Sequence, residues 1–176
     1  GAMVAALSRL IQHPSYYRWD ESGAPFGAAI DACLDEALAL ANELGLRTYR
    51  EPEGYYGYVE MGTGPEQLAI LCHVDVVPAG DATDWFSLPY ELDERSGRLY
   101  GRGVQDNKGP LVAALYAMKA LQEAQTPLRH TIRLILGTDE ENLWRCIARY
   151  KEQQPLPDAA FTPDSAFPVI NAEKRL

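Results

Sequence analysis

Leu68-Ala69-Ile70-Leu71-Cys72-His73-Val74-Asp75 is the stretch of this chain that decides its fold. It opens with a short, wholly apolar run, which is typical of a strand buried in a sheet that is covered on both faces. His73 and Asp75 follow directly, so polar side chains stand at the carboxyl end of that strand. Ligands of open α/β sheets bind beyond the carboxyl ends of the strands. The stretch therefore predicts a buried sheet with a site at its edge.

The rest of the chain alternates between patterns of helices and strands. Apolar residues at helical spacing predict helices, and short apolar or alternating runs predict strands. The expected helices cover residues 3–12, 28–44, 110–122 and 141–153, and the expected strands cover 47–49, 55–60, 68–72, 131–136 and 159–161, with a small hairpin within 90–100. In the last of these helices Leu143, Ile147 and Tyr150 are expected to face inward. Strands that alternate with helices are typical of a layered α/β domain.

Length and charge narrow the class of protein. A chain of 176 residues suits one domain or most of one. Its formal net charge of −9 argues against nucleic-acid binding, which needs a basic surface. No run of 18 apolar residues predicts a membrane span, and no secretory signal is visible, so we expect a cytoplasmic protein. Gly1-Ala2-Met3 has the form of a scar left by cleavage of an expression tag, with Met3 as the natural start.

The cysteines predict neither disulfides nor a structural zinc site. Cys33, Cys72 and Cys146 are odd in number, scattered and never spaced as Cys-x-x-Cys. Cys72 stands beside His73, as a nucleophile would, but the pattern favours a small apolar residue that ends a buried strand.

Several carboxylates, like His73, stand next to the end of a predicted strand or the start of a predicted helix. Glu140 and Glu141 come just after one predicted strand, and Asp164 comes just after another. Asp106 stands at the start of a predicted helix, where backbone N–H groups can steady a carboxylate. Each of these residues also has a simpler structural interpretation. Asp106 could be a helix cap, the two glutamates could form a charged first helical turn, and Asp164 could be a turn residue. Because all of them are expected at one edge of one domain, the pattern favours a binding site instead.

The residue types in this set suit metal ions. Histidine and carboxylates bind Zn²⁺, with Mn²⁺ and Co²⁺ as substitutes, and one carboxylate commonly bridges the two ions of a two-metal site. Asp75 suits the role of orienting His73 by accepting its other N–H. Of two adjacent glutamates, one can ligate a metal while the other stays free as a base for water.

The sequence resembles the M20 metallopeptidases and, among them, the PepV-type bacterial dipeptidases. The resemblance runs from about Leu7 to Lys174 and rests on five motifs in order: Cys72-His73-Val74-Asp75-Val76-Val77-Pro78, Leu99-Tyr100-Gly101-Arg102-Gly103, Asp106-Asn107-Lys108-Gly109-Pro110, Gly137-Thr138-Asp139-Glu140-Glu141, and Pro163-Asp164 with Phe167-Pro168. It implies the three-layer α/β catalytic domain of a zinc-dependent exopeptidase. Residues 1–176 would be its N-terminal part, with the lid domain and the C-terminal part of the catalytic domain missing.

The resemblance also implies a role for each residue of the set. One zinc ion would be held by His73 and Asp164, the other by Glu141, and Asp106 would bridge the two. Glu140 would be the general base, and Asp75 would orient His73. The peptide bond between Asp106 and Asn107 is expected to be cis.

This sequence departs from the family pattern in two ways. Asn107 stands where a second Asp is frequent, and we expect little effect because that residue is not a direct ligand. The family also has a later histidine ligand for the second zinc and a lid that supplies substrate-binding groups. Neither is found within the 176 residues, so that second ion keeps only Asp106 and Glu141, and we expect the isolated chain to be inactive.

Three functions remain open at this level. The first is a zinc-dependent dipeptidase that hydrolyses short peptides by metal-activated water. The second is an M20 amidohydrolase that deacylates N-acyl amino acids or succinyl-diaminopimelate, because specificity in the family rests mostly on the lid. The third is a non-catalytic metal-binding or interaction module. We also expect self-association, because an uncovered edge of the sheet can pair with another chain.

Overall fold

The computed structural model describes residues 1–165. In chain order its elements are α1 (Ala2–Ile11), α2 (Ala28–Glu43), β1 (Arg47–Arg50), β2 (Tyr56–Met61), β3 (Gln67–His73), the 3-10 turn η1 (Ala82–Asp84), β4 (Asp93–Arg95), β5 (Arg98–Tyr100), α3 (Lys108–Glu123), β6 (Thr131–Gly137), α4 (Arg145–Gln153) and β7 (Ala159–Phe161). Most bounds lie within two residues of those predicted from the sequence pattern. The predicted motif Phe167-Pro168 lies outside the described residues.

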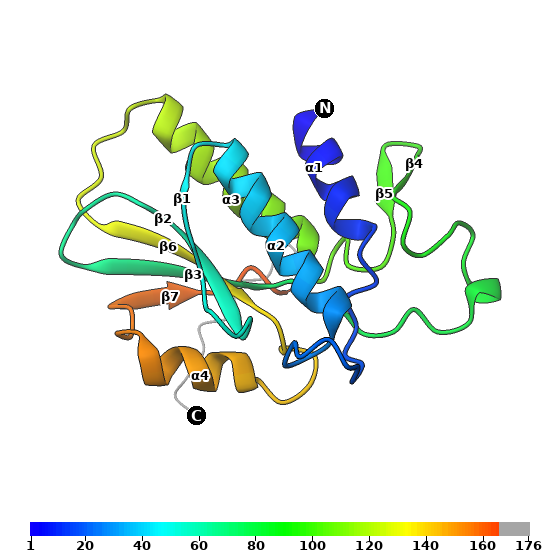
Figure 1. Cartoon of the computed structure of the whole chain (residues 1–176). Coiled ribbons are helices and arrows are strands. Elements are labelled where there is room, and N and C mark those ends of the chain that lie inside the picture. The colour runs from blue at the N-terminus through cyan, green and yellow to red at the C-terminus, as the bar shows by residue number, and fades with distance from the viewer. Residues whose placement is uncertain (166–176) are drawn as a thin grey trace.

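Five strands form one mixed sheet in the order β1-β2-β6-β3-β7 (Figure 1). β2 is antiparallel to both β1 and β6, whereas β3 is parallel to β6 and to β7. In this register His73 lies opposite Gly137. The carboxyl ends of β3, β6 and β7 therefore meet at one edge, where parallel strands place their ligand-binding loops.

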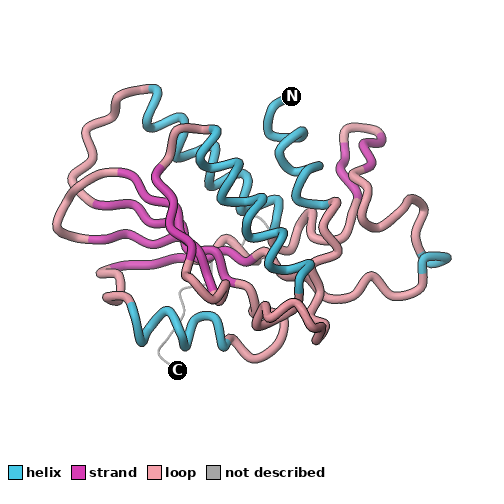
Figure 2. The backbone as a smooth tube through the Cα atoms, viewed as in Figure 1, coloured by secondary structure: helices cyan, strands magenta, loops and turns pink. Residues whose placement is uncertain are grey.

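The sheet is the middle of three layers. The helices α1, α2 and α3 cover one face, α4 covers the other, and the β4–β5 hairpin stands to one side (Figures 1 and 2). The larger core cluster joins the three helices to the sheet through residues such as Leu34, Leu115 and Leu136. A smaller cluster under α4 contains Tyr56 and Tyr150. This arrangement confirms the predicted three-layer α/β class.

The start of α4 was predicted wrongly. The helix begins at Arg145, four residues after the predicted start, and Leu143 is 73% exposed where an inward position was expected. The cause is Asp139, whose carboxylate accepts hydrogen bonds from the backbone N–H of Arg145 at 3.0 Å and from its guanidinium at 2.8 and 2.7 Å. These bonds fix the first helical residue, and Cys146 is buried instead.

A buried lysine joins α3 to the end of α1. Lys108, the first residue of α3, is fully buried, and its ammonium donates to the carbonyl oxygens of Leu10 at 2.9 Å and His13 at 2.8 Å. Carbonyls at a helix C-terminus lack partners within the helix, so they are natural acceptors for a cation. None of the described helices is both long enough and apolar enough to cross a membrane.

Candidate metal centre

His73 ends β3 and is only 3% exposed. Its Nδ1 lies 2.9 Å from the backbone oxygen of Asp75 and 3.4 Å from the carboxylate Oδ1 of the same residue. Both neighbours of Nδ1 are acceptors, so Nδ1 carries a hydrogen. When Nε2 gives up its own proton, its lone pair is free for a ligand.

Two carboxylates from distant parts of the chain face Nε2 of His73. Asp106 Oδ1 lies 3.1 Å from it, and Asp164 Oδ2 lies 3.3 Å from it. Asp106 comes from the loop before α3, and Asp164 follows β7. Ligand atoms of these three residues lie within 4.8 Å of one another, which is close enough to share an ion. The structure thus brings together the residues that the resemblance assigned to one zinc ion.

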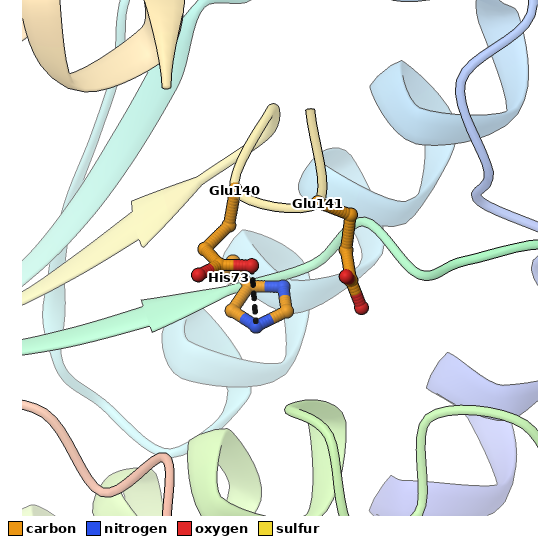
Figure 3. Close-up of side chains that lie close together, drawn as sticks. All are labelled: His73, Glu140 and Glu141. Atoms are coloured by element: carbon orange, nitrogen blue, oxygen red, sulfur yellow. Dashed lines mark ion pairs between the residues drawn. The ribbon is translucent and has the colours of Figure 1, made fainter. Parts of the chain in front are cut away.

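Glu140 and Glu141 lie in the turn between β6 and α4, ahead of the helix. Their reading as a charged first helical turn is therefore excluded. Both side chains project from this turn on the side of the imidazole (Figure 3). Glu140 Oε2 is 3.8 Å from His73 Nε2, and His73, Glu140 and Glu141 form a second group with ligand atoms within 4.8 Å.

Asp75 links the two loops that carry these residues. Its Oδ2 accepts the backbone N–H of Glu141 at 2.9 Å, while its Oδ1 faces the imidazole of His73. Asp75 is 2% exposed, and Oδ1 has no hydrogen-bond partner among the described residues. This placement suits the orienting role that the resemblance assigned to Asp75.

The carboxylates shift one another's protonation and that of the imidazole. Burial disfavours the charged form of His73, but the neighbouring carboxylates of Asp106 and Asp75 outweigh it and raise the pKa of His73 to about 11. The hydrogen bond to His73 lowers the pKa of Asp106. Burial, together with repulsion from neighbouring carboxylates, raises the pKa of both Glu140 and Glu141.

These observations fit a divalent cation. One imidazole and four carboxylates converge at one strand edge, and the repulsion among the carboxylates is the kind that a cation relieves. A proton on His73 would compete with metal, because a metal ligand must be deprotonated. Asp106 is among the charges that raise the pKa of Glu141, so these two side chains are also close enough to interact.

Two buried polar residues adjoin the centre, and the sequence analysis assigned neither of them a role in it. Asn107 is fully buried beside Asp106, and Asp139 is buried beside Glu140. The peptide bond between Asp106 and Asn107 is cis, as expected. In the sequence, both residues are polar side chains directly next to a candidate ligand.

A cavity of about 170 Å³ opens beside the centre. Its polar wall contains His73, Glu140 and Asp164, and its apolar wall includes Trp144 and Ile147. The size suits a small group rather than a large ligand.

Known proteins resemble this chain in sequence and in fold. The Bacillus subtilis (strain 168) protein named "Putative dipeptidase YtjP" is 44% identical over 152 residues, covering 86% of this chain and 32% of that protein. The chain thus spans about a third of the length of this relative. The structure of a metallo-carboxypeptidase from Sulfolobus solfataricus matches with a TM-score of 0.75 at 24% identity, over 93% of this chain and 37% of that one.

Human carnosine dipeptidase 1 matches with a TM-score of 0.69 at 25% identity, over 86% of this chain and 36% of that one. The model of the peptidase family M20/M25/M40 matches residues 69–173, a range that contains every carboxylate of the centre and His73. The chain belongs to the peptidase family M20/M25/M40.

Proposed function

We propose that the chain carries the metal centre of a zinc-dependent dipeptidase, which hydrolyses short peptides with a free N-terminus. The observation that supports this most is the convergence of His73, Asp106 and Asp164 within reach of one ion, next to Glu140. The name of the Bacillus subtilis relative supports a dipeptide as the substrate. The free, buried thiols of Cys33, Cys72 and Cys146 suit a reducing compartment such as the cytoplasm.

Each side chain has a role in this proposal. His73, Asp106 and Asp164 would hold one zinc ion, and Asp106 and Glu141 would hold a second. The ions would supply a Lewis acid for the scissile carbonyl and an acidified water. With an ion at Nε2, the oxygens of Asp75 would hold the remaining hydrogen of His73 on Nδ1.

Glu140 is the proposed general base. Burial and the carboxylates of Asp164, Asp75 and Asp106 raise its pKa, which makes it a better proton acceptor than an exposed glutamate. It takes a proton from the attacking water and passes it to the leaving amine. The cavity beside it offers room for one small side chain of a peptide.

The number of metal-ligating side chains in the 176-residue chain supports a low activity of this chain by itself. Of its three histidines only His73 lies in the centre, since His130 pairs with Glu66 at the surface and His13 lies beyond the end of α1. Within this chain the second ion would have only the carboxylates of Asp106 and Glu141. We therefore propose that this chain binds one ion well and hydrolyses dipeptides very slowly or not at all. The exposed strand β7 supports self-association through that edge, which stays a prediction.

Equilibrium dialysis of the chain against Zn²⁺ tests the centre. We expect about one tightly bound ion per chain, lost in His73→Gln and in Asp164→Asn, because each removes a ligand atom. Asp84→Asn, which removes an exposed carboxylate elsewhere, should bind as the parent chain does. Unchanged binding in both ligand variants would refute the proposed centre.

Hydrolysis assays then test the reaction. Dipeptides and N-acetyl amino acids are compared with Zn²⁺, Mn²⁺ or Co²⁺ and with none. We expect any turnover to need metal, to favour dipeptides and to vanish in Glu140→Gln. Faster turnover of N-acetyl amino acids would favour an amidohydrolase instead. A kcat on the order of 1–1,000 s⁻¹ would contradict the proposed low activity.

A further inference from the structure

Residues 10–15, which we call the N-terminal clasp, join the end of α1 to the metal centre. They precede residue 69, where the match to the family model begins, and none of them belongs to either candidate ligand group. Pro14 is exposed, yet Ser15 beside it is fully buried. A buried serine needs hydrogen-bond partners, because an unpaired hydroxyl is costly to bury.

Ser15 binds the peptide groups on both sides of Asp75. Its hydroxyl donates to the backbone oxygen of Val74 at 2.7 Å, and its own backbone oxygen accepts the N–H of Val76 at 2.9 Å. Asp75 lies between these two residues, and its oxygens face Nδ1 of His73. Ser15 therefore fixes the position of the residue that orients the imidazole of His73.

Lys108 contacts the other end of the clasp. Its ammonium donates to the carbonyl oxygens of Leu10 and His13, and the residue itself follows Asp106 by two positions. The carbonyl oxygen of His13 also accepts the backbone N–H of Ser15 at 2.8 Å. Both acceptors of the ammonium are neutral, and a buried cation is costly unless its partners offset the lost hydration. A cation buried at this cost so close to a candidate ligand points to a role in the centre.

We propose that the N-terminal clasp positions the metal ligands by setting the separation between the loop of Asp106 and the end of β3. Lys108 and Ser15, at its two ends, are the positioning residues. This inference rests on the proposed metal centre. The connection runs from Lys108 through the carbonyl of His13 to Ser15 and on to the strand end that carries His73, so it consists wholly of protein atoms. Most of the ligands are carboxylates, which repel one another, so a brace that orders them beforehand favours ion binding.

Cobalt titration of Lys108→Met tests the clasp, with Co²⁺ as a spectroscopic probe. Methionine keeps an unbranched apolar stem but cannot donate to the two carbonyls. If Lys108 acted only as a nearby positive charge, its removal would strengthen the binding of a cation. We expect the opposite sign: Co²⁺ affinity should fall on the order of 10–100-fold, as is typical when a group that orients metal ligands is lost. The visible absorption bands of bound Co²⁺ should also shift, because the geometry of the ligand group changes.

Ser15→Ala tests the other end of the clasp without any change of charge. Alanine removes the hydroxyl bond to Val74 and leaves the backbone bond to Val76 in place. We expect a smaller fall in Co²⁺ affinity, on the order of 3–10-fold, which corresponds to one neutral hydrogen bond. A purely structural role would lower the stability of both variants without altering the affinity or the spectrum of the folded chain.

Lys119→Met is the matched control for Lys108→Met. Lys119 lies on the same helix and pairs with Glu123 at 3.1 Å, so its replacement removes one positive charge without touching the clasp. It should keep the parent affinity and spectrum. Tighter or unchanged Co²⁺ binding by Lys108→Met would overturn the proposal, and so would an affinity of Ser15→Ala within about twofold of that of the parent.

All titrations are made under conditions in which circular dichroism shows the chain to be folded. If Lys108→Met does not fold, Ser15→Ala decides by itself, because it changes the fewest atoms. Failure of both variants to fold would overturn the positioning role, since the clasp would then be required for folding itself. A parent chain that binds no Co²⁺ would refute the proposed metal centre and this inference with it.

Discussion

Replacing Asp139 by Asn should destabilise the chain by about 2–3 kcal/mol. The carboxylate of Asp139 is fully buried and accepts three N–H donors of Arg145, one from the backbone at the start of α4 and two from the guanidinium. Loss of a helix cap costs roughly 1 kcal/mol, and each hydrogen bond to a charged group contributes roughly 1.5–3 kcal/mol. An asparagine keeps one acceptor oxygen, and the Arg145 side chain is 40% exposed, so water recovers part of the loss.

Urea unfolding, followed by far-ultraviolet circular dichroism, measures this change. In a chain of this size the same loss should lower the melting temperature by about 4–12 °C. Glu152→Gln is the matched control in α4, because its ion pair with Arg149 is long, at 3.9 Å, and exposed, so no measurable change is expected. A free energy of unfolding for Asp139→Asn within about 0.5 kcal/mol of the parent would refute the account of how α4 begins.

Two other perturbations test the centre and the core. In the metal-free chain the folded-state pKa of His73, about 11, lies above its unfolded value of 6.5, so its contribution to stability is complete below 6.5 and is lost as pH rises through about 11. Urea titrations from about pH 6 to about pH 9 should show a smaller fall in unfolding free energy for His73→Gln than for the parent, and equal falls would contradict the raised pKa. Leu136→Ala empties a fully buried site in β6 and should cost about 2–5 kcal/mol by calorimetry, whereas a loss under about 1 kcal/mol would mean that the core collapses around the gap.

The strands and the edge of the site were predictable because their signal is local. An apolar run followed directly by polar residues marks both a buried strand and its functional end, as at His73. The start of α4 was not predictable from periodicity, because the side chain of Asp139 decides it through bonds to Arg145.

Asn107 shows a second limit of sequence reasoning. Its amide contacts the backbone of His73 and of Pro163, which are 34 and 56 residues away along the chain, on segments whose approach only the folded sheet creates. In the sequence it was a substitution beside a candidate ligand with little expected effect. In the fold it is the one side chain that contacts the His73 strand end and the segment before Asp164 together, among the described contacts of those two segments.

The short strand β7 has a consequence for how metal binding could be observed. It has three residues, all exposed, and among the described strands it pairs only with β3. Asp164 follows it closely, so the position of that carboxylate depends on the docking of β7. Short edge strands open at low free energy, and coupling between two equilibria is reciprocal. An ion that binds Asp164 therefore favours the docked state of β7 and must slow amide hydrogen exchange in that strand. The factor by which exchange slows equals the factor by which docking of β7 strengthens the binding of the ion.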